Sequence, residues 1–179
     1  MKRCTTLCEV YFLLMLADGI LTYITISDTT RISNPLIDNL GLGIFAVVIA
    51  NIIAFIAFAY LSYFLYVKYK TKYIKAESSL EYACGLFYDR TDKPIWLLYK
   101  TPKHLSPLIA VFAFMYIYSM LLSKLMLVVE ECLLLLGADL SAYNSIFWGR
   151  ADVAVCFVCA IILMFAWFKT EYKKSADSK

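Results

Sequence analysis

Four long runs of apolar residues, separated by polar stretches, organise the chain. The most continuous run extends from Gly43 to Val67, with no charge or proline and with Asn51 and Ser62 among its few polar residues. At ~1.5 Å per residue, a helix of this length measures ~37 Å, which is enough to cross a hydrocarbon layer of ~30 Å. A water-soluble helix needs an apolar stripe, not an apolar surface on every side. The run therefore predicts a membrane-spanning helix.

The other three runs predict three more spans. We expect the spans over about residues 6–27, 43–67, 106–129 and 151–168. Unbroken runs of this length favour helices, because a membrane β-strand shows about ten residues of alternating polarity. A helix also satisfies its own backbone hydrogen bonds in lipid. The predicted fold is an all-α integral membrane four-helix bundle, a single domain over residues 1–179.

Local signals predict where the helices begin and end. Thr6–Glu9 and Ser78–Glu81 have the spacing of a capping box, in which a hydroxyl and a carboxylate satisfy the first backbone amides of a helix. Ser106-Pro107 offers a capping hydroxyl followed by a proline in the first turn. Gly137 is the expected end of the helix that begins there.

Residues 68–105 form the one long connection. Its residues 79–88 predict a short amphipathic helix, and residues 95–99 (IWLLY) are too few to span a bilayer. We expect both pieces to lie on the membrane surface. The lysines that open this loop alternate with tyrosines, so we expect them to bind anionic lipid headgroups; they are Lys68, Lys70, Lys72 and Lys75.

Composition agrees with a membrane protein, and the basic residues predict its orientation. Hydrophobic residues make up 62% of the chain and charged residues 17%, against about a quarter charged in soluble proteins. Lysine and arginine concentrate at both termini and in the 68–105 loop, whereas the other two connections hold little beyond Arg31 and Arg150. Because basic loops stay in the cytoplasm, we expect both termini and the long loop to be cytoplasmic, in the cell membrane.

A layer of polar side chains is predicted near the middle of the bilayer. At ~1.5 Å per residue from each expected entry point, polar residues of all four spans reach similar depths. They are Asp18, Asn51, Tyr116, Ser119, Cys156 and Cys159. Thr22 shares the helix face of Asp18, one turn further along. The layer predicts polar contacts inside the bundle.

Asp18 has two readings. A carboxylate at this depth costs at least ~2.5 kcal/mol, so it must face the bundle interior and be protonated or hydrogen-bonded. It either handles a proton, a cation or a partner's basic group, or it holds helices in register by bonding Asn51 or a tyrosine. We expect Lys124, in contrast, to reach the outer face of the membrane along its flexible stem, near Glu131.

Alanines recur along the second span at the spacing that lets helices approach closely. They are Ala46, Ala50, Ala54 and Ala57. This small-residue pattern predicts a packing face, either against another helix of the chain or against another subunit.

The pair Cys156 and Cys159 forms a CxxC motif in the fourth span. With four spans and cytoplasmic termini, it resembles the quinone-linked thiol oxidases of the DsbB and vitamin K epoxide reductase type. That resemblance implies thiol–disulfide exchange with a quinone as cofactor. Those families use two further cysteines outside the membrane, and this chain has only Cys132 there. The alternative is that both cysteines are small packing residues.

The sequence DGILT at residues 18–22, followed by Asn34-Pro35, resembles the opening of an uncharacterised family of small prokaryotic multi-span membrane proteins. The resemblance implies a fold and no activity. No phosphate loop, catalytic triad, metal cluster or carboxylate relay is visible in the sequence, and the lone His104 has no evident role.

We therefore expect a structural or accessory subunit, without enzymatic activity or a cofactor, in a homo-oligomer or a larger membrane complex. Its partners would be membrane lipids and membrane proteins, and not nucleic acid, which needs a broader basic surface. The alternatives are a small proton- or cation-coupled transporter using Asp18, and thiol redox at Cys156 and Cys159.

Overall fold

The computed structural model describes residues 1–26, 44–140, 143 and 151–177. Its helices are α1 (Lys2–Ile26), α3 (Ile44–Tyr63), α4 (Ser79–Tyr88), α5 (Trp96–Tyr99), α6 (Leu105–Leu135) and α8 (Ala151–Asp177). A π-helical turn, η1 (Phe64–Lys68), continues α3. The described residues contain helices and no strand, so the all-α prediction is confirmed for this part of the chain.

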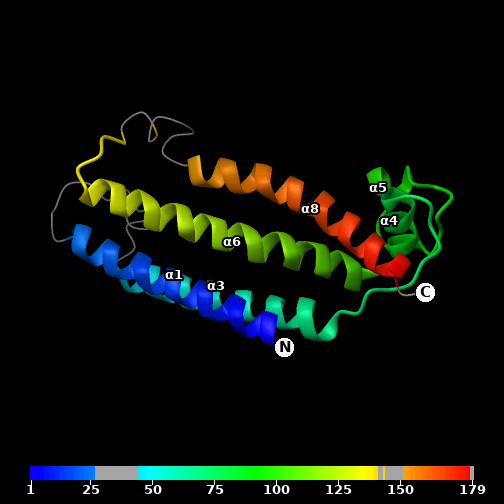
Figure 1. Cartoon of the computed structure of the whole chain (residues 1–179), viewed down its shortest axis with the longest axis horizontal. Helices are drawn as coiled ribbons and strands as arrows, with labels where there is room; N and C mark the ends of the chain where they lie inside the picture. The colour runs from blue at the N-terminus through cyan, green and yellow to red at the C-terminus, as the bar shows by residue number, and fades with distance from the viewer. Residues whose placement is uncertain (27–43, 141–142, 144–150, 178–179) are drawn as a thin grey trace.

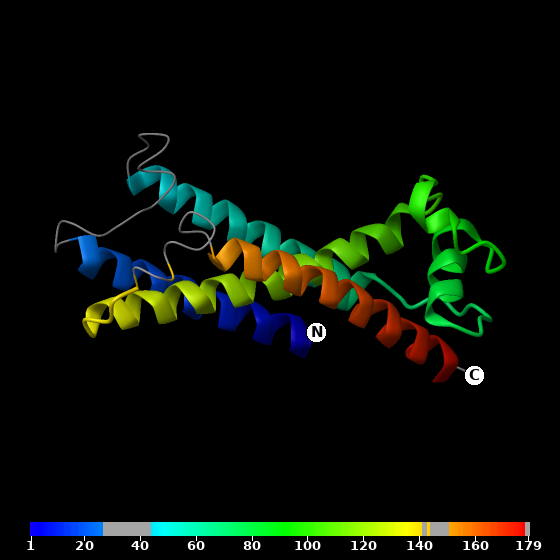
Figure 2. The same ribbon diagram turned by 90° about the horizontal axis from the view of Figure 1, so that it is seen from above.

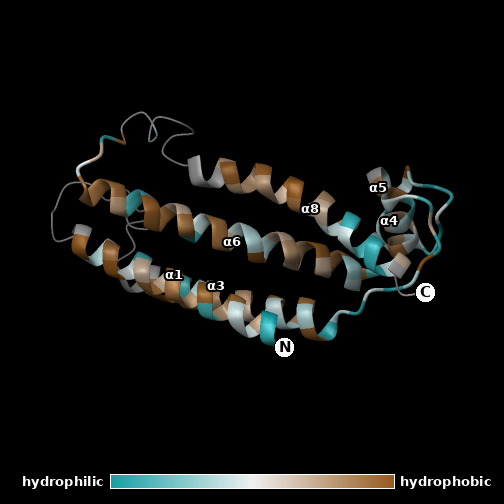
Figure 3. Ribbon diagram, in the orientation of Figure 1, coloured by the Kyte–Doolittle hydropathy of each residue, from teal (hydrophilic) through white to brown (hydrophobic). Residues whose placement is uncertain are grey.

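Four of these helices are long and apolar enough to cross a membrane: α1, α3 with η1, α6 and α8. They run side by side with alternating direction, so that the start of α1, the end of η1, the start of α6 and the end of α8 lie at the same end of the bundle (Figures 1 and 2). Apolar residues cover most of their length, and many polar residues lie at the end of the bundle where α8 meets α4 (Figure 3). The four predicted apolar spans are thus confirmed as helices.

Two of the predicted helix starts were wrong. Helix α1 begins at Lys2, and the Thr6 hydroxyl donates to the backbone oxygen of Lys2 at 3.1 Å, so Thr6 lies inside the helix. The capping box at Thr6 fails because the turn before it is already helical. Helix α6 begins at Leu105, after His104, so Ser106 is not its cap, although Pro107 does lie in its first turn.

Two other predicted boundaries are confirmed. The Ser78 hydroxyl accepts a hydrogen bond from the backbone nitrogen of Glu81 at 3.2 Å, which makes it the N-cap of α4. Gly137 follows the end of α6 with a φ of 81°, a left-handed conformation that glycine adopts without a steric penalty.

Helix α4 packs across one end of the bundle. Its residues 82–88 are all buried, and it contacts α6 and α8. We expected this helix to lie on the membrane surface, and that stays a prediction; the structure shows that protein covers its second half. The extended segment before it is tied to α8: Thr71 donates to Glu171 at 2.6 Å, and the backbone nitrogen of Ile74 donates to the Ser175 hydroxyl at 3.1 Å.

Aromatic stacking holds α1 against α3. The ring of Tyr11 is fully buried and stacks on Phe58, with 4.2 Å between ring centroids and 7° between ring planes. Phe55 extends the stack at 6.2 Å from Tyr11. The alanines predicted to make such a contact are less enclosed: Ala54 and Ala57 are half-buried, Ala50 is exposed, and the side chain of Ala46 lies outside the described residues. Large rings, more than small residues, join these two helices.

Candidate functional site

Three helices place charged and amide groups together inside the bundle. The Lys124 ammonium of α6 donates to Asp18 of α1 at 2.5 Å and to the amide oxygen of Asn51 of α3 at 3.0 Å. Asp18 and Lys124 are each only 8% exposed. The prediction that Lys124 reaches the outer face was wrong: its side chain turns inward, because a carboxylate and an amide lie there to receive it.

A second carboxylate continues this cluster along α1 and α6. Thr22 lies one turn beyond Asp18, and its hydroxyl donates to Glu131 Oε1 at 2.6 Å. Glu131 is half-buried, and its other oxygen, Oε2, is buried without a hydrogen-bond partner among the described residues. We expected Glu131 near lipid headgroups beside Lys124. Instead it faces Thr22, two helical turns from the lysine. We call Asp18, Thr22, Asn51, Lys124 and Glu131 the charge cluster.

Burial sets the energetics of the cluster. Taking a carboxylate and an ammonium out of water costs several kcal/mol per ion, and their attraction offsets that cost only when the geometry is good and other polar groups complete the shell. Lys124 meets this condition with one ionic and one amide acceptor. Removing one partner would leave an uncompensated buried charge, so the pair fixes α1, α3 and α6 relative to one another.

The other members of the predicted polar layer do not join the cluster through hydrogen bonds between described residues. The Tyr116 hydroxyl donates to the backbone oxygen of Ala54 at 3.4 Å, which links α6 to α3. The Ser119 hydroxyl is buried without a partner in the described part of the chain. Asp18 and Asn51 thus meet through Lys124, and no direct hydrogen bond joins them in the described part of the chain. The position of the polar layer in the bilayer stays a prediction.

The CxxC cysteines lie along the contact between α8 and α6. Both are half-buried and neither forms a disulfide, and Cys156 Sγ donates to the backbone oxygen of Ser119 at 3.5 Å. Cys132 is an exposed free thiol near the end of α6. These contacts fit packing residues, and the thiol-redox hypothesis stays a prediction.

Outside the bundle, Asp89 joins three segments at the end where α4 packs. It accepts from Lys72 at 2.9 Å and contacts His104 at 2.6 Å. The hydrogen bond from Lys72, followed by that from His104, lowers the pKa of the Asp89 carboxyl to about 2. His104, to which the sequence assigned no role, thus ties the start of α6 to the end of α4.

This depressed pKa predicts a loss of stability in acid. Because the folded-state pKa of Asp89 lies below the ordinary value of ~3.9, its contribution is complete above about pH 5 and is lost as the pH falls toward 2. Asp89→Asn should therefore flatten the dependence of the unfolding temperature on pH below pH 5. The measurement is thermal unfolding in detergent from pH 7 to pH 2. Parallel wild-type and variant curves would contradict the assignment.

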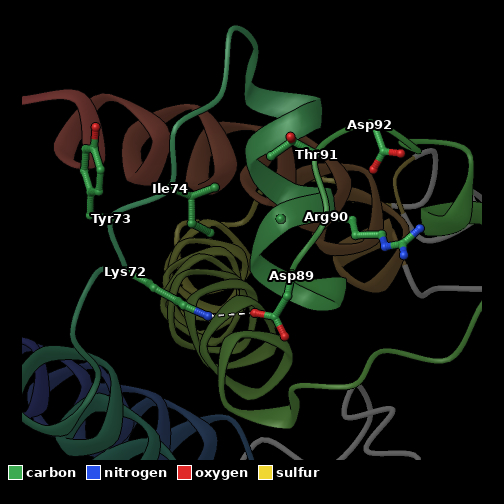
Figure 4. A pocket seen from close by; sticks show the side chains of 8 residues that line it. Lys72, Tyr73, Ile74, Asp89, Arg90, Thr91 and Asp92 are labelled. Carbon is green, nitrogen blue, oxygen red and sulfur yellow. Dashed lines mark hydrogen bonds and ion pairs between the residues drawn. The ribbon is translucent and has the colours of Figure 1, made fainter.

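A shallow hollow of ≈ 510 Å³ lies beside this contact (Figure 4). It is lined by Lys72, Tyr73, Ile74, Gly85, Asp89, Arg90, Thr91 and Asp92. One lining position requires glycine: a Cβ at position 85 would lie 2.7 Å from Ile74 Cγ2 and 3.1 Å from Thr91 Cγ2. The segments on either side of α4 thus approach its backbone too closely for a side chain.

Gly85→Ala should destabilise the protein by about 1–3 kcal/mol, the usual cost of overpacking. Gly19→Ala is the matched control, because nothing lies within 4 Å of a Cβ built at that helical glycine. Alanine there should be neutral or stabilising by up to ~1 kcal/mol. Unfolding in detergent measures both. Equal effects of the two substitutions would contradict the packing of α4 described above.

Comparisons with protein-family models, with curated proteins and with solved structures gave no match. Among the described residues, no three His, Cys, Asp or Glu side chains lie together so as to hold a metal ion. The functional argument therefore depends on the charge cluster and on the surfaces of the molecule.

Proposed function

We propose that the protein is a multi-pass protein of the cell membrane, with both termini and the 68–105 segment in the cytoplasm. The distribution of side chains supports this. Ile20 and Phe165 point outward and are 60% and 61% exposed, whereas the charged Asp18 and Lys124 lie inside. Apolar groups outside and ionisable groups inside are what a lipid solvent requires. The basic termini lie at the same end of the bundle as residues 68–105, as the positive-inside rule expects (Figure 1).

In that membrane, the protein acts as a non-enzymatic structural or accessory subunit of a homo-oligomer or a larger complex. One observation carries this choice: Asp18 and Lys124 bind one another inside the bundle. Lys124 bonds both Asp18 and Asn51, so the charges of Asp18 and Lys124 are already paired within the chain. Buried polar pairs of this kind specify how helices align. The cluster is best explained as the device that sets the helix register.

The surface proposed for a partner subunit lies around Ala50, the exposed one among the described side chains of the regularly spaced alanines of α3. Ala50 faces outward from α3, and its small side chain lets another helix approach closely. The experiment is native mass spectrometry of protein extracted in mild detergent. We expect a defined oligomer or a stoichiometric partner, lost in Ala50→Leu and kept in Ile56→Phe, which adds bulk at another exposed position of α3. A wild-type protein that is monomeric and without partners would contradict the proposal.

A second candidate is a proton- or cation-coupled membrane protein that uses Asp18. Its specific support is that the charge cluster holds two carboxylates, Asp18 and Glu131, and one lysine, which bonds only Asp18 of the two. Glu131 Oε2 is buried and without a partner among the described residues, and Thr22 connects Glu131 to the helix that carries Asp18. If both acids were ionised, the cluster would carry one negative charge in excess. A bound proton or a small cation would balance it.

This candidate is tested in liposomes that contain purified protein and a trapped pH-sensitive dye. An imposed potential should drive proton entry through the wild type, and Asp18→Asn and Glu131→Gln should each abolish it. Cys132→Ala, an exposed position one residue further along α6, should leave it unchanged. Absence of wild-type flux with protons, sodium or potassium would remove this candidate and leave the structural one.

A further inference from the structure

Three cationic side chains surround a single indole ring at the end of the bundle. The Lys100 ammonium lies 3.7 Å from the ring centroid of Trp96, that of Lys93 at 5.3 Å, and the Arg90 guanidinium carbon at 5.6 Å. The electron-rich ring face attracts each cation, which offsets part of their mutual repulsion. We call Arg90, Lys93, Trp96 and Lys100 the indole cluster.

Buried groups of α4 hold the backbone that carries this cluster. Cys84 Sγ donates to the backbone oxygen of Lys93 at 3.1 Å. The Tyr88 hydroxyl contacts the backbone oxygen of Trp96 at 3.1 Å and also that of Lys100. The ring of Tyr88 meets the indole edge-on, with 5.7 Å between centroids. Three of the four residues in the cluster are thus anchored by side chains inside the fold, so their arrangement is pre-organised.

Within the described residues, the cations of the indole cluster have no ion-paired acid. In the described part of the chain, no ion pair joins a carboxylate to Arg90, Lys93 or Lys100, although Asp89 pairs with Lys72 and His104 close by. All three basic residues are exposed. A held group of exposed cations without a counter-charge is suited to bind an anion.

The neighbouring surface indicates which anion. Ile95 and Tyr99, on either side of Trp96, are 62% and 71% exposed. Exposed aliphatic and aromatic side chains next to lysines are typical of a surface that meets the headgroup layer of a membrane. A soluble anion would gain nothing from them.

We propose that the indole cluster binds the phosphate of an anionic phospholipid in the cytoplasmic leaflet. The cations contact the phosphate, and Ile95 and Tyr99 contact the lipid beside it. This site is distinct from the lysines of residues 68–75. The proposal rests on the membrane location proposed above, and it does not depend on the subunit role.

The test is native mass spectrometry of the full chain in detergent, titrated with phosphatidylglycerol or phosphatidylcholine. The wild type should prefer phosphatidylglycerol. The triple variant R90Q/K93Q/K100Q should bind it at least ~10-fold more weakly, since each basic residue near an anionic lipid contributes about fivefold. Trp96→Leu should weaken binding by a few fold. The matched control K2Q/K169Q/K173Q removes the same charge from exposed positions at this end of the bundle and should bind like the wild type.

Three outcomes would overturn the proposal. The control triple could lose as much affinity as the cluster triple, which would indicate a diffuse charge effect. Inorganic phosphate at equal concentration could displace the lipid, which would identify a soluble anion as the ligand. The wild type could bind both lipids equally. Carbonate extraction of membranes that carry the wild type separates this failure from failure of the proposed location, because only the latter would release the protein into the supernatant.

Discussion

Lys124→Met should destabilise the protein by about 3–5 kcal/mol, one of the two largest effects that we expect from a single substitution in the bundle. Methionine fills similar space but leaves the Asp18 carboxylate, 8% exposed, without its cation. The amide oxygen of Asn51 loses its donor as well. Reversible unfolding in mixed detergent micelles, followed by circular dichroism, measures the change.

The double variant Asp18→Leu/Lys124→Met separates pairing from packing. Replacing both charges of a buried pair with apolar groups is often neutral or stabilising, so the double variant should recover most of the stability lost in Lys124→Met. Glu9→Gln, at an exposed position near the start of α1, is the control and should change stability little. The single variant Asp18→Leu completes the comparison. If the stability lost in the double variant equalled the sum of the losses in Asp18→Leu and Lys124→Met, Asp18 and Lys124 would not interact.

Tyr11→Ala should cost about 3–5 kcal/mol, the range for removing a buried aromatic ring. The ring is fully buried and stacks on Phe58 at 4.2 Å, so its loss leaves a cavity between α1 and α3. The exposed Phe12 is the neighbouring control. Phe12→Ala should cost much less, because that ring shares only part of its surface with Phe55. The same unfolding assay measures both variants.

Tyr11→Phe should be neutral or stabilising, by up to ~1 kcal/mol. The Tyr11 hydroxyl is buried without a hydrogen-bond partner among the described residues, and an unpaired buried hydroxyl costs free energy. Phenylalanine keeps the stack and removes that cost. A loss of more than about 1 kcal/mol in Tyr11→Phe would show that the hydroxyl has a partner in the folded protein.

The long helices were predictable because lipid-compatible helices carry a simple signal. Runs such as residues 43–67 are apolar on every side, and the structure places a continuous helix over α3 and η1. The Ser78 cap and the glycine after α6 were predictable for a similar reason, since each depends on residues within one turn. Helix starts at Lys2 and Leu105 were missed, because nearby hydroxyls offered competing caps.

The Asp18–Lys124 pair was missed because depth was counted from the wrong helix starts. From the observed ends, Asp18 lies ~24 Å along α1, Lys124 ~28 Å along α6, and Asn51 ~25 Å back from the end of η1, so the three are level. Starting α1 at Thr6 lowered Asp18 by ~6 Å and separated it from the lysine. The sequence did contain a signal for the pair, because one span carries the acid Asp18 and another carries the base Lys124.

Contacts between distant loop residues could not be predicted from local patterns. The indole cluster depends on how Cys84 and Tyr88 of α4 hold residues 93–100, and the Asp89 contact depends on His104 lying at the start of α6. Pattern alone read α4 as a surface helix, since its burial comes from the ends of α6 and α8. Tertiary packing, which periodicity does not encode, decides these positions.

The most direct test is cysteine labelling with a membrane-impermeant maleimide in intact cells. One variant keeps Cys132 as its only cysteine, an exposed thiol near the end of α6; the other has Lys100→Cys as its only cysteine, just before the start of the same helix. A spanning α6 with a cytoplasmic start predicts that Cys132 is labelled in intact cells and that position 100 is labelled only after the membrane is opened. Labelling of position 100 in intact cells would contradict this orientation, and identical labelling of both positions would contradict the crossing itself.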